Sequence, residues 1–168
     1  MSFNLKAQNT NFKELISLVG SEPTVEINLG PTMLSLLSSA TNSENEGISK
    51  ILSSLNSIKV TVFELEKNSK ILPIRAQLDL IADNQTQKGF EKIASVKEDD
   101  SLVYIFADVQ DKLFKSLNIS ALDDDDELVL ITIDGNILVQ DIGGLLNHFD
   151  VDLDFGALGS LKLDKNKD

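Results

Sequence analysis

The sequence predicts an α+β domain in which helices pack on one face of a mostly antiparallel sheet that ends in a four-strand meander. Apolar residues recur at helical spacing in the first half, alternating segments separate them, and four strand-like segments follow closely in the second half. With 168 residues, 42% of them hydrophobic and 25% charged, the chain is expected to form one domain spanning 1–168. We expect its core within 11–156 and flexible ends at 1–10 and 163–168.

Five elements are expected in the first half of the chain. Apolar spacing predicts helices at 11–19, 31–40 and 48–56, and alternation predicts strands at 23–30 and 58–65. Each strand alternates apolar with polar residues, so one of its faces is expected to be wet. The helix at 31–40 is expected to bury Met33, Leu34, Leu36 and Leu37.

The second half is expected to hold a helix at 73–89, four strands and a last helix. Short polar links separate the four strand-like segments, which is typical of an antiparallel meander. We expect the strands at 90–96, 102–108, 113–121 and 127–133. Asp134-Gly135-Asn136 is expected to form a turn before the last helix, which runs from Val139 to Leu146, and alternation returns at 150–155.

The charge and the cysteine content exclude several classes of protein. The net charge is −12 at pH 7, which argues against a nucleic-acid binder because such binding needs clustered cations. An anionic membrane surface is a poor partner for the same reason. The absence of cysteine excludes disulfides, thiol catalysis and cysteine-ligated metals, and we expect no cofactor. No apolar run is long enough to predict a transmembrane segment.

Two acidic segments are the candidates for a calcium site, because Ca²⁺ prefers six to eight oxygen ligands. They offer Asp123, Asp125 and Glu127 in the first segment, and Asp150, Asp152 and Asp154 in the second. The first has no glycine to turn the chain around an ion, and a solvated turn between strands explains its charge. The second departs from a calcium-binding EF-hand loop, since Phe155 stands at the glycine position and Leu161 at the glutamate position.

His148 and Arg75 are the only histidine and the only arginine in the chain. His148 could act as a general base only with a nucleophile and an orienting acid, and no nucleophile motif accompanies it. We therefore expect no catalytic residue. Arg75 either clamps a carboxylate through two hydrogen bonds or pairs with Asp79 four residues later, and the pair is the interpretation we favour.

Several stretches of this sequence resemble a known family. Val25-Glu-Ile-Asn-Leu-Gly-Pro31, the leucine-rich segment after it and Ile58-Lys-Val-Thr-Val-Phe-Glu64 resemble its first half, and 89–100 and 127–137 resemble its second. The family is the bacterial domain of unknown function 4252 (DUF4252), and the resemblance covers roughly 20–147. Its members usually carry a secretion or lipoprotein signal, so the resemblance implies an envelope location. It implies no catalytic residues.

The sequence thus favours a non-catalytic binding or interaction module of the bacterial cell envelope, whose partner is a protein or a small ligand. We expect a periplasmic protein or a lipid-anchored outer-membrane lipoprotein if a signal has been removed, and a cytoplasmic protein otherwise. Two alternatives stay open: a calcium-dependent module that uses the acidic segments, and a carboxylate-dependent hydrolase suggested by the 27 acidic residues. A calcium titration that leaves the melting temperature unchanged contradicts the first alternative.

Overall fold

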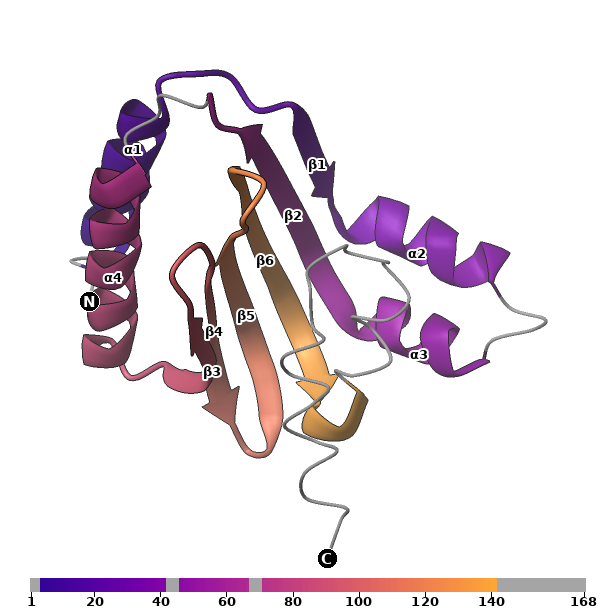
Figure 1. Ribbon diagram of the computed structural model, residues 1–168. Helices are drawn as coiled ribbons and strands as arrows, with labels where there is room; N and C mark the ends of the chain where they lie inside the picture. Colours follow the sequence, from indigo (N-terminus) through magenta and orange to yellow (C-terminus); the bar gives the residue numbers. More distant parts are fainter. Residues whose placement is uncertain (1–3, 42–45, 67–70, 142–168) are drawn as a thin grey trace, which may run out of the picture.

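The computed structural model describes residues 4–41, 46–66 and 71–141 (Figure 1). This part of the chain folds into helices and one six-stranded sheet, so the predicted α+β class is confirmed. The helices are α1 (Asn4–Val19), α2 (Pro31–Ala40), α3 (Glu46–Ser54) and α4 (Ile71–Gln87), with a short 3₁₀ turn, η1, at Val139–Asp141. The strands are β1 (Val25–Leu29), β2 (Leu55–Glu64), β3 (Glu91–Lys97), β4 (Leu102–Gln110), β5 (Leu113–Leu122) and β6 (Glu127–Leu138).

The sheet has the strand order β1-β2-β6-β5-β4-β3, and every neighbouring pair is antiparallel. Strands β3 to β6 form the predicted meander, and β6 then lies against β2, which joins the two halves of the chain. The edges of the sheet are therefore β1, near the start of the chain, and β3, directly after α4. These two edges differ in ways that bear on function.

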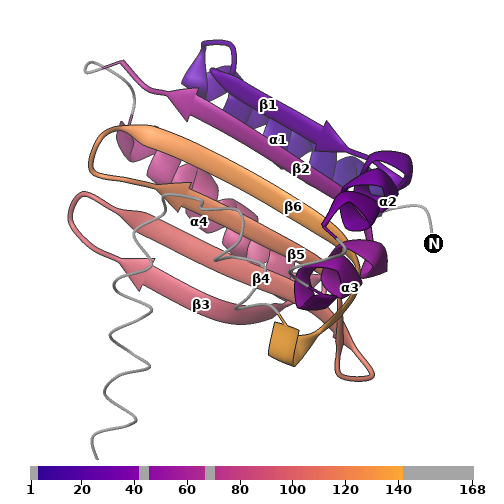
Figure 2. The same cartoon turned by 90° about the vertical axis from the view of Figure 1, so that its right-hand side faces the viewer.

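The helices cover both faces of the sheet, which corrects the expectation of one covered face (Figure 2). Helices α1 and α4 lie on one face, where Leu15 and Leu78 share a core cluster with Phe63. Helices α2 and α3 lie on the other, where Leu34 and Ile51 share a second cluster. The physical reason is that the central strands are apolar on both sides. In β6, for example, Val129, Ile131 and Ile133 belong to one cluster and Leu128 and Leu130 to the other.

Two details of the predicted helices are wrong. Helix α1 begins at Asn4, whereas the sequence predicted a helix from residue 11. Helix α2 buries Leu34 alone, whereas Met33, Leu36 and Leu37 are exposed. This helix packs mainly beside α3 and, within the sheet, mainly against β2 and β1, and most of its residues are exposed.

The predicted turn at Asp134-Gly135-Asn136 is also wrong, because β6 continues through it to Leu138. Gly135 pairs with Leu55 at an irregularity of the β2–β6 ladder. A Cβ at Gly135 would lie 2.6 Å from the Ser54 carbonyl oxygen and 2.8 Å from the Leu55 Cα. The glycine thus allows two backbones to approach closely rather than turning the chain. Of the predicted last helix only η1 is described, and the alternating segment 150–155 lies outside the described residues.

Candidate functional site

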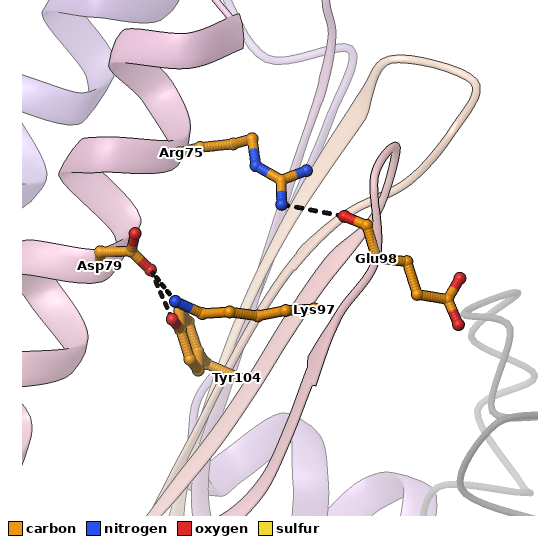
Figure 3. A network of polar contacts seen from close by, with 5 residues as sticks. All are labelled: Arg75, Asp79, Lys97, Glu98 and Tyr104. Atoms are coloured by element: carbon orange, nitrogen blue, oxygen red, sulfur yellow. Dashed lines mark hydrogen bonds and ion pairs between the residues drawn. The ribbon is translucent and has the colours of Figure 1, made fainter.

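Helix α4 presents an apolar side to the sheet and a charged side to the β3–β4 hairpin. Its fully or nearly buried residues recur with helical periodicity and are Ile74, Leu78, Ile81, Ala82 and Gln85. Arg75 and Asp79 lie one turn apart and reach toward the hairpin (Figure 3). The packing of α4 therefore fixes which polar side chains meet the end of β3 and the start of β4.

A polar network joins α4 to this hairpin. The Lys97 Nζ lies 3.0 Å from Asp79 Oδ1, and the Tyr104 hydroxyl donates a hydrogen bond to the same oxygen (Figure 3). The Lys97 ammonium lies 5.6 Å from the centre of the Tyr104 ring, and Lys92 lies 5.8 Å from it, both within cation–π range. The phenol of Tyr104 thus sits between two cations and one carboxylate.

The environment sets the protonation state of each member of this network. Burial raises the pKa of Asp79, but the hydrogen bond from Tyr104 and the contact with Lys97 outweigh it, so its pKa is lowered overall. Burial and the hydrogen bond to Asp79 raise the pKa of Tyr104. Hydrogen bonds with Tyr104 and Asp79 raise the pKa of Lys97. At neutral pH the three groups are a carboxylate, a neutral phenol and an ammonium, so neither Tyr104 nor Lys97 is in the form of a general base.

Arg75 does not form the predicted ion pair with Asp79. Its two terminal nitrogens donate hydrogen bonds to the carbonyl oxygens of Glu98 and Asp99, at 3.0 and 3.2 Å. These carbonyls belong to the β3–β4 turn, so the guanidinium holds the turn while Lys97 takes the carboxylate. The planar fork of arginine suits two adjacent carbonyls better than a lysine would.

A small cavity lies between α4 and the sheet, next to this network. It leaves about 10 Å³ for the centre of a water molecule, far below the 300–1,000 Å³ that is typical of ligand pockets. Its lining, which contains no carboxylate, comprises Phe12, Leu78, Ile81, Ala82, Gln85, Tyr104, Phe106, Asn118 and Ser120. Gln85 is 3% exposed, and its Oε1 has no hydrogen-bond partner within the described ranges. This cavity accommodates a water-sized molecule but not an organic ligand.

The first acidic segment forms the β5–β6 turn. The Asp123 Oδ1 accepts hydrogen bonds from the backbone N–H groups of Asp125, at 3.1 Å, and Glu127, at 2.8 Å. Within the described residues, no three histidine, aspartate or glutamate side chains gather in a way that would hold a metal ion. The other candidates, Asp150, Asp152 and Asp154, and His148 lie outside the described residues, so calcium binding stays a prediction.

A surface with few charged groups covers the opposite edge of the sheet. The segment 27–41 contains no charged residue, although the chain as a whole carries 27 acidic and 15 basic ones. Four of its large side chains and the neighbouring Val25 are exposed: Val25 (43%), Ile27 (41%), Met33 (48%), Leu36 (60%) and Leu37 (37%). We call these five side chains, on β1 and α2, the neutral surface. Depletion of charge together with exposed apolar side chains is typical of protein interfaces.

The comparison with known families gives one match. A family model for the Domain of unknown function (DUF4252) matches residues 18–145. The chain belongs to this family. No curated protein and no solved structure matches it. Within the described part of this DUF4252 domain, no helix has the length and apolar content needed to cross a lipid bilayer.

Sequence reasoning missed both principal features of this DUF4252 domain. The predicted strands at 90–96 and 102–108 are joined by a short link, so a hairpin between them brings Lys97 near Tyr104. The sequence contains no signal that α4 packs over this hairpin, and the contact with Asp79 depends on that packing. The neutral surface had a signal in the uncharged segment 27–41. We assigned its leucines to the core because an apolar helix usually packs inward.

Proposed function

We propose that this DUF4252 domain is a non-catalytic interaction module that binds another polypeptide through the neutral surface on β1 and α2. The observation that carries this proposal is the exposure of five large apolar side chains on two elements, β1 and α2, whose only charged residue is Glu26. Covering a half-exposed large side chain contributes about 1 kcal/mol, so five of them supply a substantial part of a binding free energy. The cavity beside α4 is too small for an organic ligand, so it offers no competing ligand site at that end of the sheet.

The polar network of Asp79, Lys97 and Tyr104 favours a structural role for the other end of the sheet. Its members satisfy one another and connect α4 to β3 and β4. A general base needs a group that is partly deprotonated near the working pH, and the raised pKa values of Tyr104 and Lys97 act against this. The region is therefore better suited to rigidity than to proton transfer.

A cross-linking experiment in the native host tests the interaction surface. A photoreactive amino acid replaces Leu36 on the neutral surface, and in a matched control it replaces Leu72, a leucine at the start of α4 that is at least as exposed. We expect a discrete adduct from position 36 that is absent from position 72 and is weakened by Met33→Ser. The absence of a discrete adduct at position 36, or the same adducts at both positions, would contradict the proposal.

We also propose that the domain acts in the bacterial envelope, as a periplasmic protein or an outer-membrane lipoprotein. The support is its family, whose members usually carry secretion or lipoprotein signals. Fractionation of the native full-length protein tests the location. Recovery in the envelope fraction is the expected result, and recovery in the cytoplasm would contradict it.

A further inference from the structure

We propose that the partner on the neutral surface is a second copy of this chain, and that the two copies join β1 to β1 in antiparallel orientation across a two-fold axis at Ile27. This inference rests on the proposed function and adds the identity of the partner. The joined sheets would form one continuous twelve-stranded sheet. Each of the following observations concerns the described residues of β1 and its surroundings.

The β1 edge has no bulge and no lysine, although with five residues it is the shortest of the described strands. Among the described strands β1 has a neighbour only on its β2 side, so one row of its backbone N–H and C=O groups faces outward. Its register with β2 is unbroken over all five residues, and it contains neither lysine nor proline. Charge and irregularity are the usual means of blunting an edge, and this edge has a single charge, at Glu26.

The β3 edge of the same sheet is protected in the usual ways. Its pairing with β4 is interrupted by a bulge between Lys92 and Ala94. Lys92 and Lys97 flank the exposed Ile93 and Ser95, and both lysines engage Tyr104. One edge of the sheet is thus protected against further strands, while the other has a regular register and a single charged residue.

The sequence of β1 is complementary to itself in one register. An antiparallel pair centred on Ile27 places Glu26 opposite Asn28 of the second copy, and Val25 opposite Leu29 of the second copy. No like charges face each other, and the apolar residues of both strands lie on one face, because Val25, Ile27 and Leu29 pair with Val62, Val60 and Ile58 of β2. A pair centred on Glu26 would instead oppose two carboxylates, so the charge selects the Ile27 register.

Charge also favours a second copy over an unlike partner. A cationic partner would need an anionic surface, and here the single acid of β1, Glu26, is accompanied by the exposed Lys59 of β2, which pairs with Asn28. Two chains of net charge −12 repel each other, and they approach with least repulsion where both lack charge. The Debye length is about 8 Å at physiological ionic strength, so added salt screens the distant acidic groups. The dimer is therefore expected to tighten as salt increases, opposite to the behaviour of a complex between unlike charges.

Symmetry makes a single cysteine a direct probe of the two-fold axis, since the chain contains no native cysteine. Ile27→Cys would place two thiols directly opposite each other, at a Cα separation of about 4.5–5.5 Å, within reach of a disulfide. Ser95→Cys, exposed on the β3 edge, is the matched control. We expect a covalent dimer from Ile27→Cys under mild oxidation, in preference to Ser95→Cys. Equal cross-linking at the two positions would overturn the proposal.

Sedimentation of the full chain with substitutions at the exposed Asn28 tests the register. Asn28→Glu would oppose two pairs of carboxylates across the axis and weaken the dimer roughly fivefold, whereas Asn28→Lys would form two pairs of opposite charge and strengthen it by a similar factor. Ser95→Glu carries the same added charge and should leave the equilibrium near that of the wild type. A dimer that responds equally to both Asn28 variants would overturn the register.

The two proposals fail in different ways. If the wild type is a monomer at all concentrations while position 36 cross-links to a different protein, the second copy is wrong and the interaction surface stands. If position 36 gives no discrete adduct and the wild type is a monomer, both are wrong. An adduct with the mass of two chains, with the cysteine and charge results above, supports both.

Discussion

Replacing Gly135 by alanine should destabilise the fold strongly, because this glycine allows two strands to approach. The added Cβ would lie 2.6 Å from the Ser54 carbonyl oxygen, about 0.8 Å inside the shortest ordinary contact, and 2.8 Å from the Leu55 Cα. Both atoms belong to the backbone, so no side chain can rotate away. Overpacking of a core typically costs about 1–3 kcal/mol, and we expect the upper end here. For a chain of this size that is a fall in melting temperature of roughly 6–12 °C.

Urea denaturation followed by far-ultraviolet circular dichroism measures this change. The midpoint should fall at an unchanged slope, since the same surface is exposed on unfolding. Gly47→Ala is the matched control, because Gly47 lies in α3 with open space where a Cβ would be added, and alanine there should be neutral or stabilising by up to about 1 kcal/mol. A Gly135→Ala midpoint equal to that of the wild type would refute the close approach of β6 to the α3–β2 junction.

Three further predictions concern α4. Tyr104→Phe should lower the free energy of unfolding by about 1 kcal/mol, since it removes a hydrogen bond to a partly exposed carboxylate; an unchanged urea midpoint would contradict this. Lys88→Met should raise the melting temperature, because the buried Nζ has no partner within the described ranges and burial lowers the pKa of Lys88; a lower melting temperature would count against it. The folded-state pKa of Asp79 lies below its ordinary value of 3.8, so its carboxylate contributes stability above about pH 4 that is lost as the pH falls through the folded pKa. The stability difference between wild type and Asp79→Asn should therefore shrink on acidification, and a constant difference between pH 7 and pH 3 would show that the network does not act through charge.

The fold class was predictable because local periodicity determines which segments form helices and strands. The helix at 31–40 has the predicted bounds, and the strand at 127–133 corresponds to the first part of β6, which continues to Leu138. The number of sheet faces that helices cover was not predictable. An apolar run such as Leu128-Val-Leu-Ile131 has no polar side, and both of its faces are buried only because helices from distant parts of the chain form two layers. Gly135 was misread for a related reason, because a glycine in a turn and a glycine at a close contact look alike in one sequence.

The candidate site was less predictable than the fold. An i, i+4 pair such as Arg75 and Asp79 usually forms an ion pair on an exposed helix, and that rule failed because each side chain found a tertiary partner. Lys97 takes the carboxylate, and the guanidinium takes the turn carbonyls of Glu98 and Asp99. These partners depend on where α4 rests on the sheet, which pairwise spacing within one helix cannot specify.

The two edges of the sheet explain why function is better sought at β1 than at the polar network. At β3 the structure combines a bulge, two lysines and the Asp79–Tyr104 connection to α4, all of which rigidify the edge and keep strands away. At β1 it combines an unbroken strand with exposed apolar side chains and an uncharged helix. Exposed apolar groups at an open sheet edge promote aggregation unless another surface covers them. The β1 edge is therefore best explained as a surface that is covered when the protein functions.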